Sequence, residues 1–355
     1  MKVKHSIIIL LFSFLAFYSC ENALMEGEPS QDPVENFDYL WEQVNEKYSY
    51  FGVRNVSWDA LYDDYRPLIN NQLSEQQLFN IMFSMLSELK DGHVNMVSPF
   101  NVSRYHISHN APENFNRRLL YDYYLRPGEL NHFNVQEHYY TTGPLIHQVF
   151  DIEERRIGYI HYSSFSNTIS DYSIDFTLAR MQTTDGLIID VRNNGGGAPS
   201  NIFKIMNRLT DRKRHIYSSR LKDGPGHNDF GEWIKVYSEP EGDIKYLNPI
   251  ILITNRNCYS ATSFFAAAAK AYPNIKQIGD TTGGGAGAPH GGQMPNGWYY
   301  RFSVTQSGYP ENGSLHDFEL GVPPDIHVDM AIEEELEGHD SMVDRAIQLL
   351  IEMKN

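Results

Sequence analysis

The stretch NPIILITNRNCYSATSFFAAAAKAY (residues 248–272) combines an apolar run, a polar turn and an alanine-rich segment. An apolar run of this length bounded by turn residues predicts a buried strand, and the alanine-rich segment predicts a helix. The same alternation continues around it, with strand-like runs at 156–165, 185–192 and 275–280 and a helix-like run at 199–210. Strands that alternate with helices predict an α/β fold with a central, mainly parallel sheet flanked by helices.

Three side chains in this stretch are candidate nucleophiles: Cys258, Ser260 and Ser263. Ser260 follows the predicted strand by a short turn and opens the predicted helix. A serine there presents its hydroxyl beside helix N-terminal amides, which stabilise a developing oxyanion. An ordinary helix-capping serine explains the same pattern.

Two further segments carry residues suited to acyl-transfer chemistry. DVRNNGGGAPS (190–200) places three consecutive glycines after a predicted strand, where backbone amides can approach a ligand closely. LKDGHVNMVSP (89–99) places His93 just beyond a predicted helix. His227 and His290 lie in glycine- and proline-rich loops and are reserve candidates for a base.

The remaining chain divides by pattern into further segments. Helical periodicity with an apolar face predicts a small N-terminal helical domain over 35–95, and the aromatic, polar segment 96–150 stays unassigned. We expect an α/β catalytic domain over 151–335 and a C-terminal helix within 336–355. GWYYRFSVTQSG (297–308) predicts one strand near the edge of the central sheet.

The first residues, MKVKHSIIILLFSFLAFYSC, have a basic start, a short apolar stretch and a cysteine at position 20. This pattern predicts a signal peptide over 1–19 that is too short for a stable transmembrane span. It resembles a bacterial lipoprotein signal, which implies lipidation of Cys20, a tether over 20–34 and a location in the cell envelope, on the periplasmic face or the outer surface of the outer membrane.

Charge and cysteine count exclude several classes of function. The net charge of -16, without a local basic run, argues against nucleic acid as a partner. Only two cysteines are present, so a lipidated Cys20 leaves no internal disulfide. We find no metal-ligand spacing and expect no cofactor.

Together these motifs resemble the C-terminal processing, or tail-specific, serine peptidase family. SATSFFAAAAKAY places Ser260 on the family's nucleophile, DVRNNGGG matches its oxyanion segment, and GVPPDI (321–326) matches its closing motif. The resemblance implies a crotonase/ClpP-like core. It also implies an oxyanion hole from the amides of Gly195 or Gly196 and of Ala261.

The family has two branches, and this sequence is similar to the one typified by the tricorn core. In the Ser-Lys branch a lysine would stand where this chain has Gly285, so that dyad is absent. The tricorn-like branch implies His93 as general base and Glu319 as the acid that orients it, with Asp317 in reserve. On a strand those two carboxylates would face the same way.

The function implied is a serine endopeptidase that hydrolyses polypeptides through an acyl-enzyme on Ser260. A catalytically silent peptide- or ligand-binding lipoprotein with the same fold is the alternative, because fold does not fix function. Hydrolysis of a non-peptide ester or a cell-wall peptide is a third. The sequence leaves the oligomeric state open.

Overall fold

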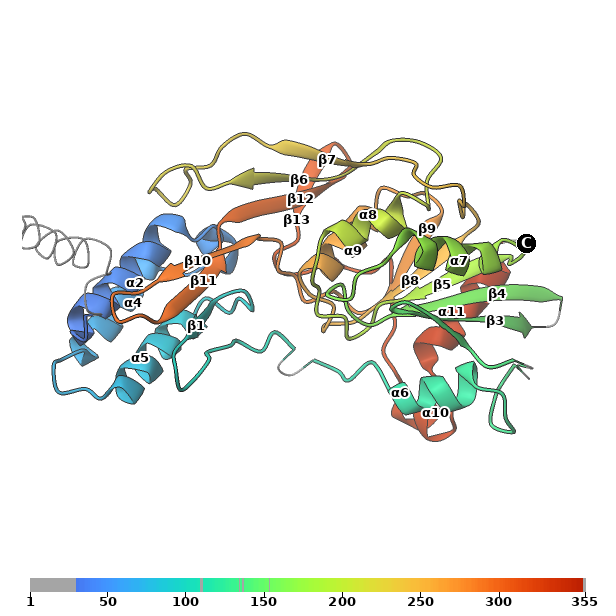
Figure 1. Cartoon of the computed structure of the whole chain (residues 1–355), viewed down its shortest axis with the longest axis horizontal. Coiled ribbons are helices and arrows are strands. Elements are labelled where there is room, and N and C mark those ends of the chain that lie inside the picture. Colours follow the sequence, from blue (N-terminus) through green and yellow to red (C-terminus); the bar gives the residue numbers. More distant parts are fainter. Residues whose placement is uncertain (1–29, 109–110, 134, 136, 153, 354–355) are drawn as a thin grey trace, which may run out of the picture.

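A seven-stranded sheet forms the centre of the larger lobe in the computed structural model, which describes residues 30–108, 111–133, 135, 137–152 and 154–353 (Figure 1). The strand order is β14-β9-β8-β5-β4-β3-β2. The five strands from β14 to β4 run parallel, and β3 and β2 extend the sheet antiparallel. Their bounds are β2 Tyr140–Thr142, β3 Leu145–Ile152, β4 Arg155–Tyr162, β5 Gly186–Asp190, β8 Ile250–Thr254, β9 Ile275–Gly279 and β14 Ile326–His327. The predicted α/β fold with a mainly parallel sheet is confirmed.

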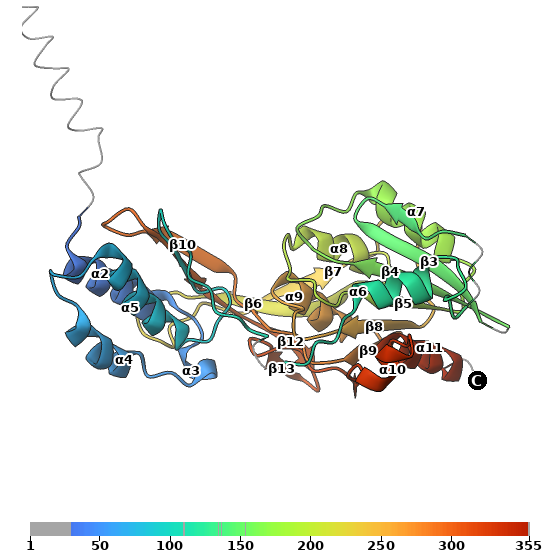
Figure 2. The ribbon, with the colours of Figure 1, turned by 90° about the horizontal axis from the view of Figure 1, so that it is seen from below.

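Helices cover both faces of this sheet, which explains the unbroken apolar runs. Figure 2 shows α7 (Asp171–Met181) and α8 (Ser200–Met206) on one side and α11 (Ser341–Glu352) on the other. Every residue of β5 and β8 is buried, and alternate residues enter different cores. Leu187 packs in the core shared with α9 (Ala261–Ala269), whereas Ile188 packs in the core shared with α11. A strand covered on both faces is apolar along most of its length, and in β5 and β8 the polar exceptions are the last residues, Asp190 and Thr254.

The smaller lobe combines N-terminal helices with a three-stranded sheet. The helices are α2 Pro33–Lys47, α3 Phe51–Arg54, α4 Trp58–Tyr65, η1 Arg66–Leu68 and α5 Glu75–Ser87. The sheet has the order β1-β11-β10, with bounds β1 Asn95–Val97, β10 Pro289–Gln293 and β11 Tyr299–Ser303. Residues 289–303 therefore lie in this lobe, although they fall within the segment that the sequence assigns to the catalytic domain.

A four-stranded antiparallel sheet, in the order β13-β12-β6-β7, connects the lobes (Figure 1). Its strands are β6 Arg214–Leu221, β7 Ile234–Ser238, β12 Thr305–Glu311 and β13 Ser314–Asp317. The single strand predicted over 297–308 at the edge of the central sheet is wrong. The segment forms β11 and β12, which belong to two other sheets.

The segment left unassigned by the sequence analysis, 96–150, contains only short elements and most of one longer strand. These are most of β1, α6 (Arg117–Leu119), η2 (Leu120–Leu125), β2 and most of β3. The C-terminal segment holds α10 (Ile332–Leu336) and α11. The predicted leader and Cys20 lie outside the described residues. Within the residues that are described, no helix is long and apolar enough to cross a membrane.

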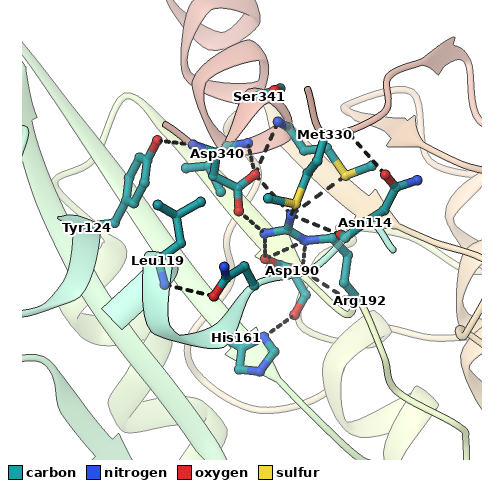
Figure 3. A network of polar contacts seen from close by, with 12 residues as sticks. Asn114, Leu119, Tyr124, His161, Asp190, Arg192, Met330, Asp340 and Ser341 are labelled. Carbon is teal, nitrogen blue, oxygen red and sulfur yellow. Dashed lines mark hydrogen bonds and ion pairs between the residues drawn. The ribbon is translucent and has the colours of Figure 1, made fainter. Parts of the chain in front are cut away.

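A buried ion cluster fixes α11 to the end of β5. The guanidinium of Arg192 lies between the carboxylates of Asp190 and Asp340, and all three side chains are fully buried (Figure 3). Asp340 also caps α11 by accepting from the amides of Met342 and Val343. Although burial alone would raise it, Arg192 holds the pKa of Asp190 below its ordinary value.

We expect Asp340→Ala to lower the free energy of unfolding by about 3–5 kcal/mol, because it leaves a buried guanidinium half-paired and removes a helix cap. Urea unfolding followed by circular dichroism measures this loss. Asp151→Ala breaks a solvent-exposed ion pair with Arg156 and serves as the control, with little change expected. Equal effects of the two substitutions would contradict a structural role for the cluster.

Candidate active site

Ser260 occupies a strained turn between β8 and α9. Its φ of 54° and ψ of -122° are rare for a residue with a side chain. Its N–H donates to the carbonyl of Gly284 at 2.9 Å, and its carbonyl accepts from the N–H of Phe264 at 3.1 Å. These bonds hold the turn so that the hydroxyl stands at the start of α9, at the carboxyl end of the sheet.

His93 reaches this hydroxyl from the smaller lobe. It lies between the end of α5 and the start of β1, and its side chain is buried. The imidazole Nε2 lies 3.0 Å from Ser260 Oγ, although 167 positions separate the two residues in the sequence. This distance is within hydrogen-bond reach, as a nucleophile and its general base require.

The carboxylate of Asp91, which is fully buried, organises the surroundings of His93. One oxygen, Oδ1, accepts from the His93 amide at 2.7 Å and from the Tyr259 hydroxyl at 2.9 Å. The other, Oδ2, accepts from the hydroxyls of Tyr48 at 3.1 Å and Ser303 at 3.2 Å. Four donors on one carboxylate fix its position.

Ser303 extends this network to the second ring nitrogen of His93. Its Oγ lies 3.5 Å from His93 Nδ1, which is long for a direct hydrogen bond. Because the Ser303 hydroxyl donates to Asp91, its oxygen lone pairs face the ring. This arrangement favours the tautomer with the proton on Nδ1, which leaves Nε2 free to accept from Ser260.

The environment of His93 disfavours the charged form of its imidazole. Burial lowers its pKa, and the positive charges of Arg301 and Arg54 lower it further, whereas Asp91 opposes the shift. A neutral ring is the form that accepts a proton from a nucleophile.

Two backbone amides beside Ser260 are available to an oxyanion. Of the three predicted donors, Gly196 donates its N–H to Asn194 Oδ1 at 3.0 Å. Among the described residues, the N–H groups of Gly195 and Ala261 have no acceptor. Gly196 has a φ of 95°, and a Cβ there would lie 2.5 Å from the carbonyl oxygen of Tyr259. The glycine is required because this loop packs directly against the nucleophile turn.

Asn194 holds the glycine loop to α9, a role that the sequence analysis did not predict. Its Oδ1 also accepts from the hydroxyl of Thr262 at 2.8 Å, and its carbonyl accepts from the amide of Tyr259 at 3.1 Å. A lone asparagine in a loop carries no signal of such long-range partners. Its position directly before three glycines was the only available clue.

The predicted acid, Glu319, does not contact His93. Its Oε1 pairs with Arg54, and its Oε2 accepts from the amide of Ala286 at 2.8 Å. The reserve acid, Asp317, accepts from the amide of Glu319. The expectation that the two carboxylates face the same way on a strand fails because β13 ends at Asp317, so Glu319 lies in the following turn.

Glu319 and Arg54 are a buried pair at the edge of the site. Burial and the charge of Asp91 raise the pKa of Glu319, while Arg54 opposes the shift. Arg54 also donates to the carbonyl of Lys90 at 2.7 Å, directly before Asp91. The pair therefore ties the 284–286 segment, which supports Ser260, to the segment that carries His93.

The rival nucleophiles are engaged elsewhere. Cys258 is fully buried, burial raises its pKa to about 12, and its thiol donates to the carbonyl of Val191 at 3.0 Å. Ser263 is buried and donates to the carbonyl of Cys258 at 3.2 Å. Of the three candidates, only Ser260 contacts a base.

The other histidines and the glycine at the lysine position are not arranged for catalysis. His227 contacts Asn45 Oδ1 at 2.8 Å, and His290 lies exposed on β10. Gly285 has a φ of 78°, and a Cβ there would lie 2.5 Å from the ring of Tyr259. A lysine at that position would displace the tyrosine that donates to Asp91.

A cavity of about 1280 Å³ opens above Ser260 and His93 and is lined by residues of both lobes and of the connecting sheet. It includes Gly195 and Ala261, whose amides are free, and apolar groups from Tyr217 and Phe264. A volume of this size accommodates a segment of polypeptide. In the part of the chain that the structure describes, no cluster of His, Cys, Asp and Glu has the makings of a metal site.

The fold and this serine–imidazole pair, with free amides beside it, are characteristic of serine hydrolases. Residues 156–328 match the model of peptidase family S41, and residues 29–87 match that of the tricorn protease C1 domain. A solved structure of a candidate peptidase from Parabacteroides merdae is 33% identical, with a TM-score of 0.82, over 90% of this chain and 97% of that one. The chain therefore belongs to peptidase family S41.

More distant similarities agree with this assignment. The chloroplast C-terminal processing peptidase of Tetradesmus obliquus is 27% identical over 187 residues, which are 52% of this chain and 38% of that protein. The chain thus matches less than half the length of this curated relative. Mature CPAF is 10% identical with a TM-score of 0.65, over 90% of this chain and 96% of that one, which indicates a shared fold alone.

We expect the imidazole of His93 to titrate below pH 6.5, its ordinary value, because burial and two nearby arginines disfavour the charged ring. Asp91→Asn removes the opposing negative charge and should lower the pKa further. Glu319→Gln should have a smaller effect, because Glu319 pairs with Arg54 and does not contact His93. NMR titration of the histidine resonances measures these pKa values.

His93→Gln identifies the resonance in that titration. A pKa at or above 6.5 in the wild-type protein would contradict the burial argument. A larger downward shift for Glu319→Gln than for Asp91→Asn would show that Glu319 is the carboxylate coupled to the ring.

Proposed function

We propose that the protein is a serine endopeptidase that hydrolyses polypeptides through an acyl-enzyme on Ser260. The observation that carries this proposal is the 3.0 Å separation of Ser260 Oγ and His93 Nε2 in a cavity large enough for a peptide. Membership of a peptidase family supports polypeptide as the substrate.

In the proposed reaction, Ser260 Oγ attacks the scissile carbonyl carbon while His93 Nε2 accepts the hydroxyl proton. The amides of Gly195 and Ala261 donate to the oxyanion that forms. The imidazolium then protonates the leaving amine, which departs and leaves an ester on Ser260. A water molecule deprotonated by His93 hydrolyses that ester and restores the enzyme.

We assign Asp91, acting through Ser303, as the carboxylate that stabilises the imidazolium. The protonated ring would direct Nδ1–H toward Ser303 Oγ, which itself donates to Asp91. Glu319 is then a positioning residue, since it supports the 284–286 segment through the Ala286 amide.

The site is proposed to operate in the cell envelope, on a chain anchored by lipid at Cys20, as the leader sequence indicates. A silent binding protein remains the competing function. The strain at Ser260 and the two free amides favour the enzyme, because a binding protein gains nothing from either.

We expect a fluorophosphonate to label the wild-type protein on Ser260, as identified by mass spectrometry, and Ser260→Ala to abolish labelling. Cleavage of unfolded casein by Ser260→Ala should fall by about 10⁴-fold or more, because the nucleophile is lost. Circular dichroism checks that the fold is retained. Ser166→Ala alters an exposed serine lining the same cavity and is the matched control.

The outcome of these measurements separates the two functions. Normal turnover by Ser260→Ala would refute the nucleophile assignment. A folded wild-type protein that neither takes the label nor cleaves casein would identify the silent binding protein.

We expect Asp91→Asn to lower kcat by about 10²–10⁴-fold, because the imidazolium loses its stabilising charge. Glu319→Gln, which also replaces one carboxylate by an amide of the same shape, should lower kcat much less. Its main effect should be on stability, since Arg54 loses its partner. Steady-state kinetics and urea unfolding of both variants test this assignment, and the reverse order of kcat losses would restore Glu319 as the orienting acid.

A further inference from the structure

One face of the small sheet β1-β11-β10 forms a wall of the active-site cavity. Val97, Val102 and Tyr299 are exposed on this face, and all three line the cavity. The alternate residues, such as Met96 and Phe302, are buried against the helices of the smaller lobe. The sheet thus presents a surface to whatever occupies the cavity.

Two arginines lie in one row across this face. Asn95 of β1 pairs with Arg301 of β11, and Arg301 pairs with Gly291 of β10. The bridge between Val97 and Val102 sets the register of the next segment. Continuing that register places Arg104 opposite Asn95. The four residues of the row, Arg104, Asn95, Arg301 and Gly291, all line the cavity.

The guanidinium groups of Arg104 and Arg301 have no partner among the described residues. Most other described arginines pair with a carboxylate, as Arg54, Arg192 and Arg208 do. A chain with a net charge of -16 offers many acids, so two unpaired arginines in one row are unusual. A Cβ at Gly291 would lie 2.3 Å from the carbonyl oxygen of Tyr300, so the glycine there allows β10 to pack closely against β11.

The row shares strand β11 with Ser303, the residue that approaches the ring of His93. Arg301 precedes Ser303 by two residues on β11, so both face the same way, and Ser303 Oγ approaches His93 Nδ1. In the proposed reaction His93 protonates the leaving amine. His93 and the row line one cavity, so the substrate path proposed here takes the polypeptide that follows this amine past His93 toward the row.

We propose that Arg104 and Arg301 bind a carboxylate of the polypeptide substrate on the leaving side of the scissile bond, which makes them specificity-determining residues. This inference rests on the proposed function. An arginine fork matches a carboxylate geometrically, and charge-assisted hydrogen bonds are stronger than neutral ones. The carboxylate is either an Asp or Glu side chain or the C-terminus of the substrate.

A bound carboxylate would also act on the base. The positive charge of Arg301 lowers the pKa of His93. A carboxylate on Arg301 offsets that charge, so His93 is a stronger base when such a substrate is bound.

A set of fluorescent eight-residue peptides tests the proposal. One Glu is moved along an otherwise neutral sequence, Gln replaces it in matched peptides, and each peptide has a free or an amidated C-terminus. We expect kcat/KM to be about 10- to 100-fold higher for a Glu beyond the cleaved bond, or for a free C-terminus there, than for the uncharged match. If the Glu peptides are preferred, the bound carboxylate is a side chain. If the peptides with a free C-terminus are preferred, it is the C-terminal carboxylate.

The double variant Arg104→Gln/Arg301→Gln should lose this preference, and circular dichroism checks that its fold is retained. Arg118→Gln removes one charge from a side chain that is 91% exposed and only ion-paired with Asp122, and it should keep the preference. Equal wild-type rates for charged and uncharged peptides, or a preference that survives in the double variant, would overturn the proposal.

Binding to Ser260→Ala keeps the test independent of turnover. Fluorescence anisotropy should show tighter binding of the preferred peptides, weakened by salt and lost on adding the two arginine substitutions. If the wild-type protein takes no label and cleaves nothing, the proposed function fails, whereas this measurement still decides whether the arginines bind a carboxylate. Equal binding of Glu and Gln peptides would then refute the arginine site itself.

Discussion

The buried carboxylate of Asp91 is the constraint on which the candidate site depends. Its four donors come from four separate parts of the chain: Tyr48 beyond α2, the amide of His93 beyond α5, Ser303 of β11 and Tyr259 of the nucleophile turn. A buried carboxylate without donors is costly, so these groups are held together as one unit. The smaller lobe, which carries the base, is thereby fixed to the turn that carries the nucleophile.

Close backbone contacts provide the second half of this arrangement. Gly196 and Gly284 have positive φ angles and approach the Tyr259–Ser260 segment and the carbonyl of Glu319, respectively, too closely for any side chain. Glu319 and Arg54 then connect this packed region to Lys90, beside Asp91. The strained turn at Ser260 is therefore supported from both sides, which is the condition under which such strain persists.

The sequence predicts the central sheet well, because buried parallel strands such as β5 and β8 are apolar along most of their length and are bounded by turns. It predicts less about the site. The meeting of His93 with Ser260 followed from a family resemblance, and no local pattern contains it. Single polar residues such as Asn194 and Ser303 carry no periodic signal, and their partners lie far away in the chain. The segment 297–308 was misassigned because β11 and β12 are continuous in sequence yet join different sheets.

The charged side chains around His93 connect the strength of this base to the charge of the proposed substrate. Burial and two arginines disfavour the imidazolium of His93. The charge of Asp91 favours it, but the pKa is still lowered overall. Arg54 is paired with Glu319, whereas Arg301 on the cavity wall has no partner among the described residues. A base weakened by an unpaired cation accepts a proton less readily, which opposes catalysis for a neutral substrate. A carboxylate on the incoming chain removes this penalty, so the same residue that would select the substrate would also adjust the proton affinity of His93.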